Sequence, residues 1–209
     1  MSVVDAAHIK ALSEDFIRQR LAARQADPYI SPFRESLRPG EARPAAVLIP
    51  LLRQDDAWHV LLIRRTHVDG DHHSGQVAFP GGRVDASDAS PQQAALREAH
   101  EEIGVEPESV RVLGQMEEMV TISNYQVTPV VGVIPWPFAI DPQESEVARV
   151  FTVPLAWLAD PAHHEERQRE IPGEQRSIGV HYFEKYDGEL LWGVSARLMV
   201  NFLQALDVI

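Results

Sequence analysis

The sequence predicts an α+β fold, an α/β/α sandwich in which a mixed β-sheet lies between helices. Short apolar runs typical of strands recur along most of the chain, whereas helical periodicity is confined to its centre and its two ends. Strands and helices do not alternate regularly, which argues against a purely parallel sheet. The chain has 209 residues, 44% of them hydrophobic, so it can bury a core without disulfides or a structural metal.

The N-terminal segment predicts a helix followed by a connector. Apolar residues recur at near-helical spacing between residues 5 and 24, and prolines then punctuate the chain up to residue 44. We therefore divide the chain into an N-terminal helix with its connector, residues 1–40, and a main domain, residues 41–209. The apolar helical positions are Ile9, Leu12, Phe16 and Leu21, and the prolines are Pro28, Pro32, Pro39 and Pro44.

The main domain begins with β-like runs and contains two further helices. Ser90 is a good N-cap, Pro91 suits the first helical position and Gly104 is a natural stop, which together predict a central helix over residues 90–103. A C-terminal helix is expected to carry one apolar stripe, formed by Leu191, Leu198, Phe202 and Leu206. The expected strands cover residues 46–52, 59–63, 76–79, 110–116, 126–134, 147–153 and 178–183.

Charge and composition exclude several classes of function. The 31 acidic residues outnumber the 19 basic ones, for a net charge of -12, whereas nucleic acids and anionic membranes require a basic face. Because the chain contains no cysteine, it has no thiol catalysis, cysteine zinc site or disulfide. We see no leader sequence and no apolar run near the ~18 residues of a membrane span, and we expect a cytoplasmic protein.

Three glutamates of the central helix form the main chemical feature. Glu98, Glu101 and Glu102 are spaced i, i+3 and i+4, so their carboxylates share one face of the helix. Hard divalent cations such as Mg²⁺ and Mn²⁺ prefer carboxylate oxygens and would relieve the repulsion between them. The alternative is an ordinary amphipathic helix whose acidic face is solvated.

The sequence around this helix resembles the Nudix box, whose usual form is G-x5-E-x7-R-E-U-x-E-E-x-G-U with U aliphatic. From Arg97 to Val105 every defined position matches, with Ala99 at the first aliphatic position. The early acidic residue is Asp88 rather than glutamate, and it lies one residue further from Arg97 than usual. The resemblance implies a Nudix-type sandwich that hydrolyses a nucleoside diphosphate linked to another group.

Further segments resemble the coenzyme A pyrophosphatases within that family. The similarity extends over about residues 45–205, and it is most specific upstream of the box. Residues 66–72 depart from the group, because this stretch is one residue longer and lacks a second basic residue. The matching segments are LLIRR at residues 61–65, HSGQVAFPGG at 73–82, YQVTPVVG at 125–132 and LWG at 191–193.

The resemblance implies Mg²⁺ or Mn²⁺ as the cofactor and assigns roles around it. Glu98 and Glu102 would be metal ligands, and Glu101 would complete the cluster or orient a bound water. Arg97 would orient a catalytic glutamate, and the Gly81–Gly82 backbone would supply a carbonyl ligand.

Outside the box, the general base and the phosphate contact are expected from loops and strand ends. Glu146 is the preferred base and Glu144 the alternative, and either could be a solvated loop acid. Arg65 would hold a substrate phosphate through paired N–H donors, unless it is an ordinary surface arginine at a strand end. The clustered His67, His72 and His73 are interpreted as a polar loop, and the segment Pro135–Phe138 as a turn with a packed aromatic.

These roles imply hydrolysis of coenzyme A or its derivatives to 4′-phosphopantetheine, free or acylated, and adenosine 3′,5′-bisphosphate. Two alternatives remain: the same chemistry on ADP-ribose or NADH, or a non-catalytic binding module with the same fold. The expected partner is a small nucleotide, not a nucleic acid or a membrane, and a homodimer is compatible with the sequence.

Overall fold

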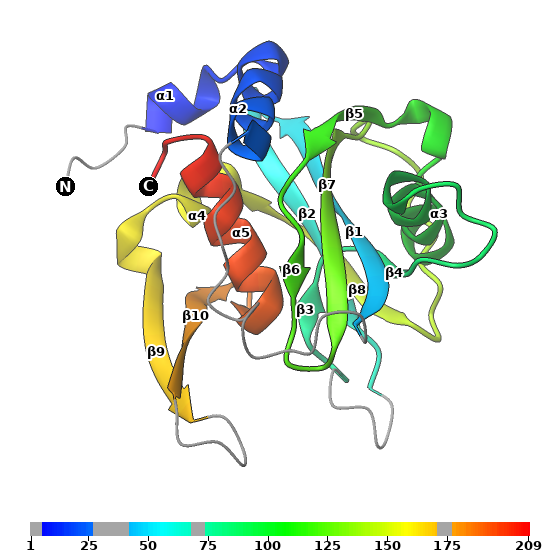
Figure 1. Ribbon diagram of the computed structural model, residues 1–209. Coiled ribbons are helices and arrows are strands. Elements are labelled where there is room, and N and C mark those ends of the chain that lie inside the picture. Colours follow the sequence, from blue (N-terminus) through cyan, green and yellow to red (C-terminus); the bar gives the residue numbers. More distant parts are fainter. Residues whose placement is uncertain (1–5, 27–41, 68–73, 171–176) are drawn as a thin grey trace.

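The computed structural model describes residues 6–26, 42–67, 74–170 and 177–209, and it confirms the predicted α+β class. Figure 1 shows helix α3 (Pro91–Ile103) on one face of a mixed β-sheet, with α2 (Glu14–Ala26) and α5 (Gly193–Ala205) on the other. The remaining described helical segments are α1 (Ala6–Lys10), α4 (Leu155–Leu158) and the 3-10 turns η1 (Pro107–Ser109) and η2 (Pro161–His163).

The strands form two sheets. The seven strands expected from the sequence are all present, with shifted ends, and four short or strongly polar strands are added: β4, β6, β9 and β11. In the described residues the strands are β1 (Arg43–Gln54), β2 (Ala57–Arg65), β3 (Val77–Ala78), β4 (Gly81–Arg83), β5 (Arg111–Gln115), β6 (Met119–Val120), β7 (Tyr125–Val133), β8 (Val147–Pro154), β9 (His164–Glu170), β10 (Ser177–Tyr186) and β11 (Glu189–Trp192).

The larger sheet is organised around β1. Its strand order within the described residues is β3-β2-β1-β7-β5, while β4 pairs with β1, β6 with β7 and β8 with β2. The pairing of β1 with β7 is parallel and the other pairings are antiparallel. A tight turn joins β1 to β2, where Asp55 and Asp56 both have positive φ, 50° and 58°.

Alternating residues of β1 face two separate cores. Ala46 and Leu48 pack with Ala95, Ala99 and Ile103 of α3. On the opposite face, Ile49 and Leu51 pack with the residues of α2 and α5, and this cluster also contains the buried side chains Ile9, Leu12, Ile17 and Leu21. The sheet is therefore covered on both faces, as the sandwich predicts.

The N-terminal helical pattern is divided into two helices. α1 ends at Lys10 and α2 begins at Glu14, because Ser13 caps the second helix and accepts a hydrogen bond from the Phe16 N–H at 3.1 Å. The connector from residue 27 to residue 41 lies outside the described residues, whereas Pro44 is part of β1.

The C-terminal pattern also differs from the expected helix. Leu191 lies in β11, and α5 begins only at Gly193, where the backbone has a positive φ of 69°. Leu198 and Phe202 face the core from α5, and Leu206 is buried at its C-cap. The smaller sheet, of order β11-β10-β9, packs against this helix.

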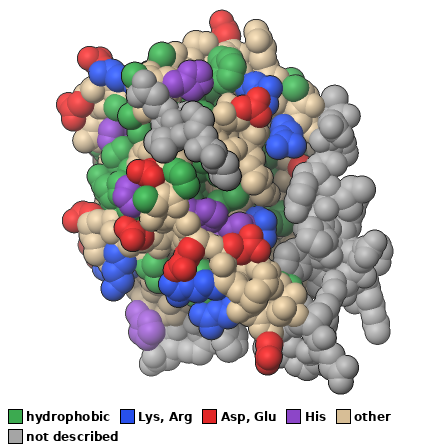
Figure 2. Space-filling model, turned by 90° about the vertical axis from the view of Figure 1, so that its left-hand side faces the viewer, with side chains coloured by type: hydrophobic (Ala, Val, Ile, Leu, Met, Phe, Trp, Pro, Cys, Tyr) green, Lys and Arg blue, Asp and Glu red, His purple; other side chains and the backbone are tan. Residues whose placement is uncertain are grey.

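The outer surface of α1, α4 and β9 carries mixed charge. Figure 2 shows acidic, basic and histidine side chains interspersed on this face rather than gathered by sign. Strand β9 is mostly charged, which explains why hydrophobic alternation did not predict it and which protects an exposed sheet edge from pairing. In the described residues no helix is both long and apolar enough to cross a bilayer.

Candidate active site

Helix α3 is positioned by strong signals at both ends. The Ser90 hydroxyl accepts a hydrogen bond from the Gln93 N–H at 3.2 Å, and the Gln93 side chain accepts one from the Ala89 N–H at 2.7 Å. At the other end, Gly104 adopts a left-handed conformation with φ of 75° and its N–H donates to the His100 carbonyl. These caps fix the rotation of the helix, and with it the direction of its glutamates.

The Gly81–Gly82 strand brings the backbone against two of these glutamates. The Gly81 N–H donates to Glu102 Oε2 at 2.9 Å. At Gly82, a Cβ atom would lie 2.5 Å from the carboxyl carbon of Glu98, so only glycine leaves room for that carboxylate. The two glycines, at the start of the box, therefore help to position the side chains of Glu98 and Glu102 near its end.

Glu102 is a buried carboxyl group with spare bonding capacity. Its exposed fraction is 1%, and its Oε1 atom has no hydrogen-bond partner among the described residues. Burial is the main factor that raises the pKa of Glu102 to about 8, with smaller effects from the charges of Glu98 and Glu146. A buried acceptor of this kind is costly unless another group satisfies it.

Arg97 connects the other two glutamates of the trio. Its Nη1 atom donates to Glu98 Oε1 and to Glu101 Oε2, both at 3.0 Å. Burial raises the pKa of Glu98, and the neighbouring charge of Arg97 opposes that rise. The like charges that the helical spacing creates are thus compensated by an arginine on the same helix.

Asp88 holds this arginine from the loop before the helix. Arg97 donates to Asp88 Oδ1 from Nε at 3.1 Å and to Oδ2 from Nη2 at 3.0 Å, a two-point pairing. Only 2% of the Asp88 side chain is exposed, and the hydrogen bonds from Arg97 lower the pKa of Asp88. The loop before α3 accommodates the one additional residue between Asp88 and Arg97. Asp88 therefore reaches Arg97 although its side chain is shorter than that of the usual glutamate.

Arg65 lies beside Glu102 at the end of β2. Its Nη1 atom is 3.8 Å from Glu102 Oε1, and its buried Nε has no hydrogen-bond partner in the described part of the chain. The β2–β8 register shifts between Arg64 and Arg65, and such irregularities commonly redirect side chains next to active sites. Arg64 instead pairs with the buried Glu189 at 3.1 Å.

The segment before β8 distinguishes the two candidate bases. The Gln143 N–H donates to the Glu102 carbonyl at 3.1 Å, which attaches this segment to the end of α3. The Glu146 charge contributes to the raised pKa of Glu98 and of Glu102, after burial. For Glu144, the described contact is from its backbone carbonyl, which accepts the Thr66 hydroxyl at 2.9 Å. The segment that carries Glu146 is thus attached to α3, and the choice of Glu146 over Glu144 stays a prediction from the sequence.

The donor set fits a hard divalent cation. Glu98, Glu101 and Glu102 offer carboxylate oxygens, which such ions prefer, and Oε1 of Glu102 has no hydrogen-bond partner among the described residues. Within the described ranges, no three acidic or histidine side chains already converge closely enough to enclose an ion. The three carboxylates therefore form no closed metal site among the described residues, and their role as metal ligands stays a prediction from the sequence.

The remaining residues singled out in the sequence make local contacts where the structure describes them. Ser74 bonds to His67 at 2.8 Å, whereas His72 and His73 lie outside the described residues. The Pro135–Phe138 segment is a turn in which the rings of Trp136 and Phe138 pack edge to face at 6.1 Å, as interpreted from the sequence.

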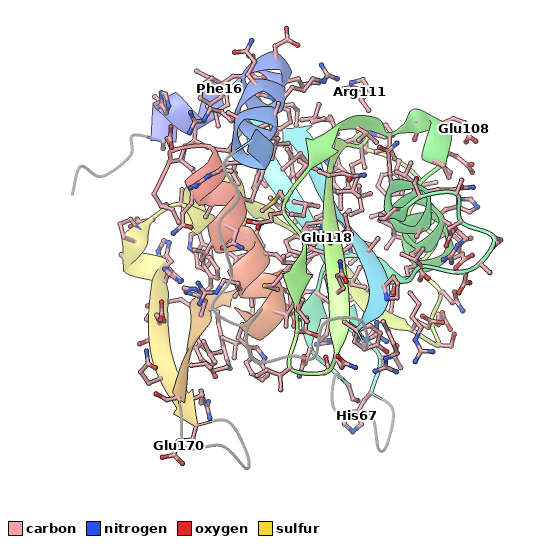
Figure 3. The ribbon with its side chains drawn as sticks, viewed as in Figure 1. Phe16, His67, Glu108, Arg111, Glu118 and Glu170 are labelled. Atoms are coloured by element: carbon pink, nitrogen blue, oxygen red, sulfur yellow. The ribbon has the colours of Figure 1, made fainter. Side chains whose placement is uncertain are left out.

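Sequence reasoning did not single out Glu118. Its carboxylate accepts hydrogen bonds from Gln126 and from Thr128, the latter at 3.2 Å, and Figure 3 shows it beside the central strands. An isolated acid between two short strands carries no spacing signal, because its partners come from a strand that follows it in the chain.

Comparison with known proteins settles the family. The family model described as the NUDIX domain matches residues 42–174, which include every residue of the site described above. The chain belongs to the Nudix family. Its relatives include proteins named Uncharacterized Nudix hydrolase NudL, from Enterobacter sp. (strain 638) and Escherichia coli (strain K12). Each is 39% identical over 157 residues, a match that covers 75% of this chain and 79% of the relative.

Solved structures support the same fold. A MutT/nudix family protein from Enterococcus faecalis superimposes with a TM-score of 0.54 at 15% identity, covering 99% of this chain and 76% of that one. As a Nudix hydrolase, the chain acts on pyrophosphate bonds in small nucleotide substrates, and enzymes of this family generally use divalent metal ions.

Proposed function

We propose that this Nudix chain hydrolyses the diphosphate of coenzyme A or its derivatives. The observation that supports the reaction is the buried Glu102 carboxyl group. It accepts the Gly81 N–H and lies 3.8 Å from the Arg65 guanidinium, and its Oε1 atom has no hydrogen-bond partner among the described residues. The choice of coenzyme A rests on the resemblance of the segments at residues 61–65 and 73–82 to coenzyme A pyrophosphatases; these segments contain Arg65 and Gly81, which contact Glu102.

The carboxylates of Glu98 and Glu102 would hold Mg²⁺ or Mn²⁺, with Glu101 as a further ligand. When bound, such ions neutralise the diphosphate and lower the pKa of a coordinated water. Arg97 is a positioning residue in this scheme, because it fixes Glu98 and Glu101 while Asp88 fixes its own guanidinium. The Gly81 N–H holds the Glu102 carboxylate, and the family resemblance implies that the Gly81–Gly82 backbone also supplies a carbonyl ligand to the metal.

Arg65 and Glu146 act on the substrate side. The Arg65 side chain is 31% exposed, so its exposed N–H groups can donate to a phosphate oxygen while Nη1 stays near Glu102. Glu146 is the proposed general base, because its charge reaches both metal-binding glutamates and its loop is attached to α3. Expulsion of the nucleoside phosphate then leaves 4′-phosphopantetheine and adenosine 3′,5′-bisphosphate.

A substrate comparison tests this proposal. The purified protein is incubated with Mg²⁺ or Mn²⁺ and with coenzyme A, ADP-ribose or NADH in turn, and kcat/KM is measured for each. We expect coenzyme A to be the best of the three. A tenfold preference for ADP-ribose or NADH would overturn the substrate assignment while keeping the chemistry.

A non-catalytic binding module is the second candidate. It requires the buried carboxyl group of Glu102 to have a purely structural role, although its Oε1 atom is unpaired and its burial is costly. Absence of turnover on all three substrates with both metals would favour this candidate. A cytoplasmic location and a homodimer remain expectations from the sequence.

A further inference from the structure

A second polar cluster lies where β1 and β7 begin and β4 ends. The Arg43 guanidinium lies over the ring of Tyr125, with its Cζ atom 4.1 Å from the ring centroid. Arg83 donates to the Tyr125 hydroxyl oxygen from Nε at 3.3 Å and from Nη2 at 3.2 Å. We refer to these three residues as the Arg43–Tyr125–Arg83 cluster.

The strand register explains why the three side chains meet. Arg43 is paired with Tyr125 in the parallel β1–β7 ladder, and Arg83 is paired with Ala45 in the antiparallel β1–β4 ladder. Residues two apart on a strand share a face, so all three side chains emerge on one side of the sheet. Backbone pairing, rather than flexible surface contact, therefore places the two guanidiniums on the same tyrosine.

These two arginines differ from the others in the way their charge is balanced. Arg64, Arg111 and Arg149 each contact a carboxylate within 3.1 Å. In the described part of the chain, Arg43 and Arg83 instead contact the Tyr125 hydroxyl, the Tyr125 ring and the Ser123 carbonyl. Both guanidiniums are exposed, so the cluster is a concentrated positive charge on a protein of net charge -12.

The cluster is adjacent to the proposed active site. Gly82 contacts the Glu98 carboxylate, and the next residue, Arg83, points to the opposite face of β4. The Arg83 carbonyl also accepts a hydrogen bond from Arg97 Nη2 at 3.1 Å. Among the described strands β4 pairs only with β1, so a substrate lying across its other edge would contact Glu98 on one side and Arg83 on the other.

We propose that the Arg43–Tyr125–Arg83 cluster binds a phosphomonoester of the substrate, separate from the diphosphate that is cleaved. Arginine guanidiniums match phosphate oxygens through paired N–H donors, and the Tyr125 hydroxyl, which accepts from Arg83, keeps its own proton for donation. The ring of Tyr125 holds Arg43 in place before binding, which reduces the entropy lost on association. The Arg43 guanidinium covers one face of that ring, so a phosphate fits the cluster better than a stacked base.

This inference rests on the proposed function and narrows it. Coenzyme A carries a phosphomonoester on the ribose next to its diphosphate, whereas ADP-ribose and NADH do not. The cluster would therefore favour coenzyme A over dephospho-coenzyme A, because only the former carries this phosphomonoester. For the same reason it would favour NADPH over NADH.

Binding of reaction products tests the subsite independently of turnover. Titration calorimetry in Mg²⁺ buffer compares adenosine 3′,5′-bisphosphate with AMP, which lacks the second phosphate. We expect wild type to bind the bisphosphate about tenfold or more tightly, from charge-assisted hydrogen bonds. Arg43→Gln and Arg83→Gln should each reduce this ratio at least threefold. Arg111→Gln is the control: it removes an exposed arginine that pairs with Val133, at the opposite end of β7 from Tyr125, and it should preserve the ratio.

Kinetics separates failure of the subsite from failure of the proposed function. If wild type binds both probes equally, or if neither cluster variant changes the ratio, the subsite is wrong whatever the enzyme hydrolyses. If coenzyme A and dephospho-coenzyme A are both inert, the proposed function is wrong and the subsite is judged on kcat/KM for NADPH against NADH. We expect the kcat/KM for coenzyme A divided by that for dephospho-coenzyme A to fall in both arginine variants. The same ratio should be unchanged in Arg111→Gln.

Discussion

At the scale of single residues, Glu102 links protein stability to the proposed chemistry. Its pKa in the folded protein is raised to about 8, well above the 4.5 of an exposed glutamate, because the carboxyl group is buried. Folding therefore favours the protonated form, and the resulting stability is complete below pH 4.5 and is lost as the pH rises through 8. A bound cation would lower this pKa, so the proposed metal ligand would release its proton when the cation binds.

The first prediction follows from the raised pKa of Glu102, which makes the folded protein less stable as the pH rises. In EDTA, wild type should be less stable at pH 9 than at pH 6.5, on the order of a few kcal/mol in the free energy of unfolding. Glu102→Gln cannot ionise and should accept the Gly81 hydrogen bond equally well. Thermal melts should therefore show the variant more stable than wild type at pH 9, and more stable by a smaller margin at pH 6.5. Equal pH dependence in both proteins would contradict the assignment.

The second prediction concerns Gly82. Gly82→Ala would place a methyl group 2.5 Å from the Glu98 carboxylate, which must move away; we expect reduced turnover and a loss of stability of about 1 kcal/mol or less. If the contact with Glu98 is the cause, adding Glu98→Ala should restore stability without restoring activity. Urea unfolding of the single and double variants measures this, and a double variant as unstable as Gly82→Ala would refute the steric explanation.

At the scale of elements, the caps of α3 make the site rigid. The Ser90 hydroxyl satisfies an otherwise unpaired N–H at the helix start, so Ser90→Ala should cost about 1 kcal/mol. Ser87→Ala is the matched control, because Ser87 is exposed in the preceding loop. Denaturant unfolding should show a loss for the first variant and almost none for the second. Equal effects would mean that the cap does not stabilise the helix.

The elements also show which parts of the fold were predictable. The central helix follows from Ser90, Pro91 and Gly104, and the long strands follow from apolar runs, because burial produces both patterns. Strand β9 was missed because it is charged and exposed, and Leu191 was assigned to the wrong element because a buried leucine fits a strand as well as a helix. A single apolar residue does not distinguish periods of 2 and 3.6.

The site was predictable to the extent that it lies within one helix. The spacing of Glu98, Glu101 and Glu102 is local, so it can be inferred from the chain alone. The partnership of Arg97 with Asp88 depends on a loop, and that of Arg83 with Tyr125 on the pairing of strands distant in sequence. Such contacts depend on tertiary register, which no local pattern encodes.

At the scale of the whole molecule, the N-terminal helices are part of the main hydrophobic core. Ile17 on α2 is fully buried in the cluster that contains α5. Ile17→Ala should therefore lower stability by roughly 2–5 kcal/mol. Ile122→Ala, at a position that is 57% exposed, makes the same chemical change and should alter stability by less than about 0.5 kcal/mol. Urea denaturation compares them, and a minor effect at Ile17 would show that the N-terminal helices fold separately.

The acidic character of the whole chain is consistent with a polyanionic substrate. In the proposed site, the trio of α3 would attract cations, and Arg65 and the Arg43–Tyr125–Arg83 cluster would supply positive charge for the phosphates. Most of the remaining acids are solvated, so the net charge of -12 reflects solubility more than function.

The most direct test of the central claim is product analysis with one variant. Wild type and Glu102→Gln are incubated with coenzyme A and Mg²⁺ or Mn²⁺, and the products are quantified by mass spectrometry. We predict equal amounts of 4′-phosphopantetheine and adenosine 3′,5′-bisphosphate from wild type, and at least a hundredfold lower rate from the variant. Intact coenzyme A after incubation with wild type, or near wild-type turnover by Glu102→Gln, would contradict the account.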